Sequence, residues 1–162
     1  MSENNNKWIF QTNPDRYRMK DALLDLYTGR KPQLKKQTWG VNNQYKYLVK
    51  EGGIAFIWIC KGKYKEKAGI YGVADIGSSP MVIDEFEYER DYWKKEEDKG
   101  KKELRVIIEI TKHLVNKPLM ERELKKERGL QNLPILKPRH SGTNFKVSDE
   151  EYVILSKLIK NR

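Results

Sequence analysis

The residue types most often used for chemistry are few and scattered in this 162-residue chain. Its two histidines, His113 and His140, have no histidine or cysteine partner at the spacing of a metal site. Cys60 ends the apolar run IAFIWIC, where we expect an inert thiol. Neither a GxSxG nucleophile motif nor a GxxxxGK[ST] phosphate loop is present, and the acidic residues 96–98 are flanked by lysines, as on a solvated surface. The sequence therefore predicts no enzyme, no cofactor and no metal site.

The charge balance indicates a polyanionic partner. Lys and Arg number 33 against 23 Asp and Glu, which gives a net charge of +10. Such an excess favours nucleic acid first and an acidic membrane surface second, the alternative being a merely lysine-rich surface. The segment MSENNNKW lacks the apolar stretch of a signal peptide, and no apolar run approaches the length of a membrane span. With a single cysteine, we expect a cytoplasmic protein without a membrane partner.

Two of the four tryptophans lie in polar surroundings. Trp39, in the stretch QTWGVNN, and Trp93, in the segment 89–102, are both predicted to lie in lysine-rich loops, whereas Trp8 and Trp58 lie in predicted strands. Aromatic rings in a basic setting can stack on unpaired bases, each stack contributing about 1–3 kcal/mol. The alternative is that each ring anchors its loop to the core.

Short strands and helices alternate along the chain. Strands are predicted at 7–11, 52–60, 68–77 and 102–112, and helices at 15–29, 118–130 and 148–160. Asn13 and Pro14 are expected to begin the first helix, and Ser148 with Glu151 forms a capping-box pattern for the last. The polar segment 89–102 is expected to be a mobile loop. These features predict one α+β domain spanning 1–162, with a small curved sheet or barrel and peripheral helices.

Six segments in this order, KWIFQTNP, QTWGVN, GGIAFIWICKG, AGIYGVADIGSSP, LRVIIEI and HSGTNFKVSDEEYVIL, resemble the EVE domain of the PUA-like superfamily. The resemblance covers nearly the whole chain, and EVE domains are similar to YTH domains, which read methyladenine in RNA. It implies a PUA-like curved sheet or pseudo-barrel of about six strands flanked by helices. It also implies a non-catalytic pocket for a modified base, used in bacteria and archaea as the specificity module of modification-dependent restriction systems beside a nuclease or NTPase domain.

The same resemblance implies a set of base-binding residues. Trp39 would stack on the base and Gly40 would let the backbone approach it. The remaining positions are Gln11, Thr12 and Asn13 at the end of the first strand, Trp58 and Tyr71 in the wall or floor, Trp93 in the polar insert 89–102, and Ser141, Gly142, Thr143 and Asn144 at the mouth. Three alternatives stay open: Asn13 as a helix cap, Trp58 as a core residue, and 141–144 as a cap of the last helix.

Basic side chains near these segments are candidates for phosphate contacts. They are Arg30, Lys31, Lys35, Lys36, Lys61, Lys63, Lys65, Lys94 and Lys95.

The leading hypothesis is a module that flips and reads a modified base in DNA: methylated or hydroxymethylated cytosine, or methyladenine. A buried methyl group contributes only about 0.8 kcal/mol, so discrimination requires a rigid cavity. A hydroxymethyl group would need a polar partner, for which Thr12, Ser141 and Thr143 are candidates. The alternatives are an RNA-binding PUA- or YTH-like domain, with DNA favoured over RNA, and an ASCH-type nucleoside hydrolase.

Overall fold

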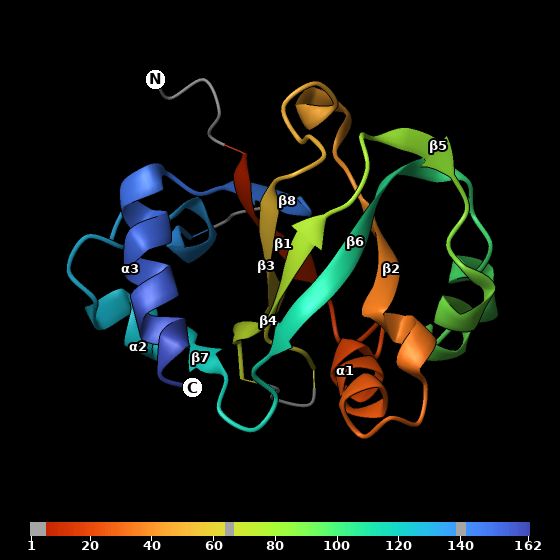
Figure 1. Ribbon diagram of the computed structural model, residues 1–162, viewed down its shortest axis with the longest axis horizontal. Helices are drawn as coiled ribbons and strands as arrows, with labels where there is room; N and C mark the ends of the chain where they lie inside the picture. The colour runs from red at the N-terminus through yellow and green to blue at the C-terminus, as the bar shows by residue number, and fades with distance from the viewer. Residues whose placement is uncertain (1–5, 64–66, 139–141) are drawn as a thin grey trace.

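A computed structural model of the protein describes residues 6–63, 67–138 and 142–162, and its centre is a curled mixed sheet (Figure 1). The main path has the strand order β2-β6-β4-β3-β1-β8. Its members are β1 (Lys7–Thr12), β2 (Lys36–Gly40), β3 (Ile54–Ile59), β4 (Gly69–Ile76), β6 (Glu103–His113) and β8 (Asn144–Lys146). The short strands β5 (Met81–Ile83) and β7 (Leu119–Met120) pair with β6 and β4. The predicted fold class, α+β with a curved sheet of about six strands and flanking helices, is confirmed.

Both faces of the sheet are buried, and the strand sequences show why. In β1, Trp8 and Phe10 belong to one apolar cluster and Ile9 to the other, as the alternation of side chains along a strand requires. The first cluster includes buried residues of α1 (Met19–Tyr27), and the second includes those of α2 (Glu121–Lys126) and α3 (Asp149–Lys160). In Figure 1, α2 and α3 accordingly lie on one side of the sheet, and α1 lies near the lower end of β2.

The helix ends follow local side-chain chemistry, with one departure from expectation. Ser148 and Glu151 form the predicted capping box: the Glu151 amide donates to Ser148 Oγ at 3.1 Å and the Ser148 amide to Glu151 Oε1 at 2.9 Å. The first helix begins only at Met19, because Asn13 Oδ1 accepts from the Asp15 amide at 2.8 Å and forms a local turn instead. The prediction that Asn13 caps this helix is wrong.

The two edge strands of the main path, β2 and β8, are joined by the side chain of Asn144. Its Nδ2 donates to the Gly40 carbonyl at 3.0 Å, and its Oδ1 accepts from the Asn42 amide at 2.8 Å. Asn42 Oδ1 in turn accepts from the Thr143 amide at 3.0 Å. This clasp holds the curled sheet as a half-barrel whose seam lies between β2 and β8.

The insert at 89–102 is structured rather than a mobile loop, and that prediction is corrected. It contains the 3-10 turns η4 (Glu87–Tyr92) and η5 (Glu96–Asp98), and both Tyr92 and Asp98 are buried. The Lys94 amide donates to the Arg16 carbonyl at 2.9 Å, and Trp93 forms an isolated bridge with Tyr17. Backbone pairing therefore fixes the insert beside the chain that leads into α1.

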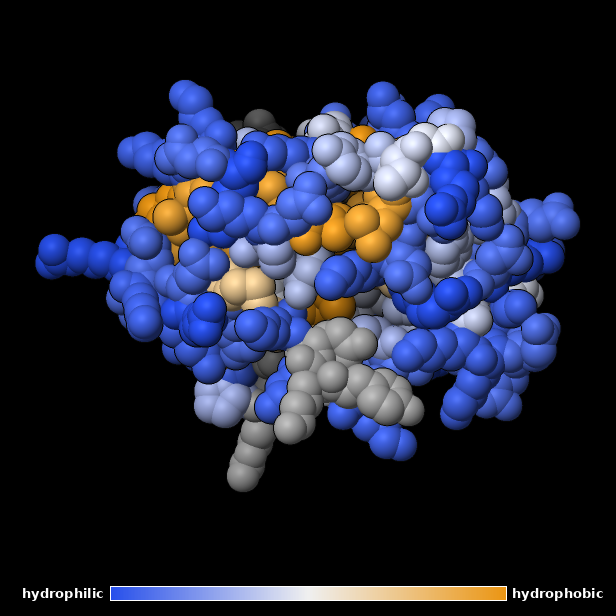
Figure 2. All heavy atoms as spheres, turned by 90° about the horizontal axis from the view of Figure 1, so that it is seen from below, coloured by the Kyte–Doolittle hydropathy of each residue, from blue (hydrophilic) through white to orange (hydrophobic). Residues whose placement is uncertain are grey.

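The surface seen from below (Figure 2) is dominated by hydrophilic residues, and apolar residues show only in limited areas between them. Within the described part of the chain, no helix has both the length and the apolar character needed to cross a membrane.

Candidate nucleic-acid interface

A cavity of about 470 Å³ opens where the end of β1, the edge strand β2, the start of β8 and the insert meet. Its lining is unusually mixed: aromatic rings, small polar groups, four carboxylates and three cations. The lining residues are Gln11, Thr12, Asn13, Arg16, Tyr17, Thr38, Trp39, Gly40, Cys60, Glu85, Glu89, Trp93, Asp98, Lys101, Glu103, Arg105, Gly142 and Thr143.

Trp39 and Gly40 lie together on one side of this cavity, at the end of β2. Trp39 is on a strand rather than in the predicted loop, and it is 6% exposed. Its ring stacks on Phe10, with ring centroids 6.0 Å apart and an interplanar angle of 26°. Gly40 leaves open space, since a Cβ built there would meet no atom within 4 Å. The tryptophan thus belongs to the core and to the cavity wall at once.

Another part of the lining is built by backbone and amide contacts between β1 and the segment before β8. The Gln11 amide donates to the Thr143 carbonyl at 2.8 Å, and Gln11 Nε2 donates to the Gly142 carbonyl at 2.9 Å. Gly142 has φ of 101°, a conformation that glycine adopts readily. These bonds continue the β1–β8 pairing past the first residue of β8, Asn144, and both Thr12 and Thr143 line the cavity.

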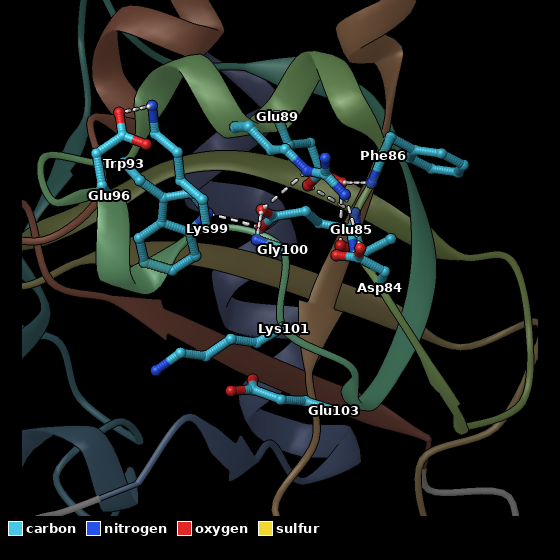
Figure 3. Close-up of polar contacts among 12 residues, drawn as sticks. Asp84, Glu85, Phe86, Glu89, Trp93, Glu96, Lys99, Gly100, Lys101 and Glu103 are labelled. Atoms are coloured by element: carbon cyan, nitrogen blue, oxygen red, sulfur yellow. Dashed lines mark hydrogen bonds and ion pairs between the residues drawn. The ribbon is translucent and has the colours of Figure 1, made fainter.

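Trp93 is held by a buried carboxylate that sequence reasoning did not single out. Glu85 accepts from Trp93 Nε1 at 2.6 Å and from the Gly100 amide at 2.9 Å. Figure 3 shows Glu85 directed toward Trp93 and Gly100, while Lys101 and Glu103 extend below this cluster in a common direction. The Trp93 ring lies 4.9 Å from that of Tyr17, so the insert contributes a fixed aromatic wall.

Glu89 is a second buried carboxyl of the lining. Its oxygens accept from the Thr38 amide at 2.9 Å, from Thr38 Oγ1 at 3.0 Å and from the Phe86 amide at 2.9 Å. Burial raises its pKa to about 7, although these three hydrogen bonds act in the opposite direction and the charge of Glu85 adds to the rise. Glu89 consequently changes protonation near neutral pH.

Two further lining residues, Tyr17 and Arg105, each have one buried polar atom without a partner in the described part of the chain. Among the described residues, the Tyr17 hydroxyl and Arg105 Nε have no hydrogen-bond partner, although Tyr17 is 8% and Arg105 6% exposed. Burial, followed by the charges of Glu89 and Glu85, raises the pKa of Tyr17, while Arg105 lowers it. Tyr17 therefore remains protonated, and it lies within electrostatic reach of Glu89, Glu85 and Arg105.

The family to which the fold belongs follows from a comparison of the sequence with family models. The model of the EVE domain matches residues 6–158. The chain belongs to the EVE domain family. The resemblance inferred from the six segments is thereby confirmed.

Solved structures share the fold of this EVE domain. A hypothetical protein from Leishmania major has a TM-score of 0.64 at 19% identity, over 99% of this chain and 98% of that one. The human THYN1 protein, in a complex with 5-methylcytosine-containing DNA, has a TM-score of 0.59 at 20% identity, over 94% and 96%. The DUF55 domain of human thymocyte nuclear protein 1 has a TM-score of 0.59 at 19% identity, over 96% and 99%. No curated protein matches in sequence.

The EVE domain brings together eight of the twelve residues expected to bind a base. These are Gln11, Thr12, Asn13, Trp39, Gly40, Trp93, Gly142 and Thr143. Ser141 lies outside the described residues, and Asn144 serves as the clasp between β2 and β8.

Trp58 and Tyr71, expected in the wall or floor, lie in the core instead. Trp58 is 1% exposed and belongs to the apolar cluster on the other face of the sheet, because its position on β3 alternates with that of Ile57. Tyr71 is 5% exposed, and its hydroxyl donates to the Lys67 carbonyl at 2.8 Å. Neither side chain lines the cavity.

The expected phosphate-binding residues that the structure describes are not part of the cavity lining. Lys65 is not among the described residues. The eight others do not line the cavity: Arg30, Lys31, Lys35 and Lys95 pair with Asp25, Asp91, Glu109 and Glu97, and Lys36, Lys61, Lys63 and Lys94 are exposed.

The cations that do line the cavity are Arg16, Lys101 and Arg105, which sequence reasoning missed. Of these three cations, only Arg105 could have been noticed in the sequence, because it is a charged residue within the apolar strand LRVIIEI.

Proposed function

We propose that this EVE domain binds DNA and holds one modified base in the cavity beside Trp39. The observation that carries the proposal is the cavity itself, whose volume of about 470 Å³ falls in the range of small-ligand sites of roughly 300–1,000 Å³. Trp39 and Trp93 supply aromatic surface, and Thr12 and Thr143 supply polar groups at the rim. The human THYN1 protein, which shares the fold, forms a complex with 5-methylcytosine-containing DNA, and this supports the same class of ligand here.

A base within a duplex must leave the stack to reach such a cavity. Unstacking and unpairing cost a few kcal/mol, which stacking on aromatic side chains and contacts to phosphates can offset. The net charge of +10 suits this task. Lys61 and Lys63 follow Cys60 of the lining and Lys94 follows Trp93, so these exposed lysines are the members of the predicted set placed next to cavity residues.

In this proposal, the cavity distinguishes the modified base from the plain base by the shape of the space that the modification fills. A methyl group is worth about 0.8 kcal/mol on burial alone, roughly a fourfold preference, so a larger preference requires a space that stays empty with the plain base. The paired and buried residues around the cavity, Glu85 with Trp93 and Trp39 on Phe10, provide the necessary rigidity. A hydroxymethyl group would find a partner in the hydroxyl of Thr12 or Thr143.

The domain acts in this proposal as a reader without catalysis, the specificity module of a modification-dependent restriction system whose nuclease or NTPase belongs to a partner. Modified DNA is preferred to modified RNA.

Competition binding tests the proposal. A labelled duplex carrying one 5-methylcytosine is displaced by matched duplexes with cytosine, 5-hydroxymethylcytosine or methyladenine, and by the equivalent RNAs. We expect one modified DNA to compete at least several-fold better than its plain counterpart. Equal competition by all the duplexes would refute base reading, and a stronger competitor among the RNAs would refute the preference for DNA.

Gly40→Val is the variant that isolates the cavity. Because Gly40 lines the cavity and a Cβ there meets no atom within 4 Å, we expect the valine side chain to take up cavity space without a clash in the free protein. We expect an unchanged melting temperature, a lost preference for the modified duplex, and retained salt-dependent background binding. A Gly40→Val protein that keeps the full preference would place the base elsewhere.

A further inference from the structure

Arg105 is a buried cation without a good partner, and it lies at the cavity that the proposed function assigns to the base. It is 6% exposed, and among the described residues its guanidinium makes two polar contacts, from Nη2 to the Lys101 carbonyl at 3.4 Å and to Glu103 Oε2 at 3.5 Å. Both are long against the usual 2.7–3.2 Å, while Nε has no partner among the described residues. A guanidinium withdrawn from water and left with weak bonds is costly to the fold, which suggests that its partner is a ligand.

The sheet register places this guanidinium beside the open part of the cavity. Arg105 on β6 is the register partner of Gly40 on β2, and both line the cavity. Since Gly40 has no side chain and open space lies over it, the space next to Arg105 is left free for a ligand. Tyr17, another residue of the lining, lies within electrostatic reach of both Arg105 and Glu89.

The chemistry of the guanidinium limits what it can bind there. Arginine presents several N–H donors in a planar fork and no acceptor, so it fits two adjacent acceptors. On the Watson–Crick edges of the pyrimidines, cytosine offers such a pair, O2 and N3. Thymine and uracil have a donor at N3, and adenine has one ring acceptor next to an amino donor. The carboxylates of the lining suit the exocyclic amine of cytosine and repel the O4 carbonyl of thymine.

We propose that Arg105 is the specificity-determining residue of the cavity: its guanidinium donates to O2 and N3 of an everted cytosine, so that cytosine and its 5-substituted forms enter and thymine is rejected. This inference rests on the proposed function. The modification is carried on C5, which lies on the far side of the ring from O2 and N3. Arg105 therefore determines which base binds, and the wall that faces C5 determines which modification is accepted.

A comparison of 5-methylcytosine with thymine separates the two kinds of reading, because both bases carry the 5-methyl group and differ only at N3 and C4. Each is placed opposite an abasic site in otherwise identical duplexes, which makes the cost of extrusion similar. For the unaltered protein we expect tighter binding of 5-methylcytosine by about five- to 150-fold, the discrimination of one bidentate contact.

Two substitutions at Arg105 and one control test the assignment. Arg105→Met removes the donors with little change in length, and Arg105→Lys keeps the charge but not the fork. We expect both to bring the 5-methylcytosine to thymine ratio near one while the preference for 5-methylcytosine over cytosine persists. Arg122→Met removes the charge of an exposed arginine that does not line the cavity, and it should leave the ratio unchanged.

The outcomes distinguish this inference from the proposed function. If the unaltered protein binds 5-methylcytosine and cytosine equally, the proposed function fails. If it prefers 5-methylcytosine but the ratio to thymine survives in Arg105→Lys, the base-reading role of Arg105 is overturned. An equal loss of affinity for all duplexes would also overturn it, since that is the result expected of a phosphate contact. Arg105→Met should not lower the melting temperature, and if it fails to fold, Arg105→Lys decides.

Discussion

Glu89 makes the stability of this EVE domain depend on pH in an unusual direction. Most carboxyl groups stabilise a folded protein when they ionise, but burial raises the pKa of Glu89 from 4.5 to about 7. Between these two values the folded protein holds a proton that the unfolded chain has lost. The contribution of Glu89 is therefore fully present below pH 4.5 and is lost as the pH rises through 7. A difference of 2.5 pKa units corresponds to about 3 kcal/mol.

The assay is chemical unfolding of the native protein and of Glu89→Gln at a series of pH values from 4.5 to 8.5. The glutamine cannot titrate. Its side-chain NH2 group would face the N–H of Phe86 or of Thr38 and cannot accept a hydrogen bond from it, so the free energy of unfolding of the variant is lower by a constant of about 1–3 kcal/mol. We expect the stability advantage of the native protein over the variant to shrink by about 3 kcal/mol from low to high pH.

Glu87→Gln, on the exposed side of the same turn, controls for the loss of one negative charge. A difference between the native protein and Glu89→Gln that stays flat, or that grows with pH, would refute the reasoning.

Three further substitutions test the cavity wall, the clasp and a helix end. Trp39→Ala should lower the free energy of unfolding by about 3–5 kcal/mol, measured in urea, because the ring is buried against Phe10; a loss under 1 kcal/mol would mean that the ring is not part of the core. Asn144→Ala should cost about 1–3 kcal/mol by leaving the Gly40 carbonyl and the Asn42 amide unpaired, and hydrogen exchange should then quicken at the seam between β2 and β8. Ser148→Ala should cost about 1 kcal/mol, and an unchanged melting temperature would show that the capping box contributes nothing.

The elements that could be predicted from the sequence are those with strong local patterns. The apolar runs of β3, β4 and β6 identified central strands, and the Ser148–Glu151 pair located the start of α3. The strands missed were β2, β5, β7 and β8, of five residues or fewer. In β2, the polar residues Gln37 and Thr38 are buried beside Trp39. Their polarity is typical of an exposed loop, although the surrounding residues bury the strand.

The cavity was predictable only in part, for a similar reason. Positions next to conspicuous motifs, such as Trp39 with Gly40 and the pair Gly142 and Thr143, were placed together by resemblance to the family. The acidic residues of the lining were not predicted, because Glu85, Glu89 and Asp98 lie in a segment whose composition is typical of a solvated surface. Their burial depends on the way the insert folds back against the chain before α1, a long-range contact with no signal in local composition.

The proposed function depends most on where the base lies. A crystal structure of the protein with a short duplex carrying a single 5-methylcytosine tests this directly. The account predicts that the modified base is everted, lies in the cavity beside Trp39 and Gly40, and has its O2 and N3 facing the guanidinium of Arg105. A base that remains stacked in the duplex, with the DNA bound to another face and the cavity empty, would contradict it.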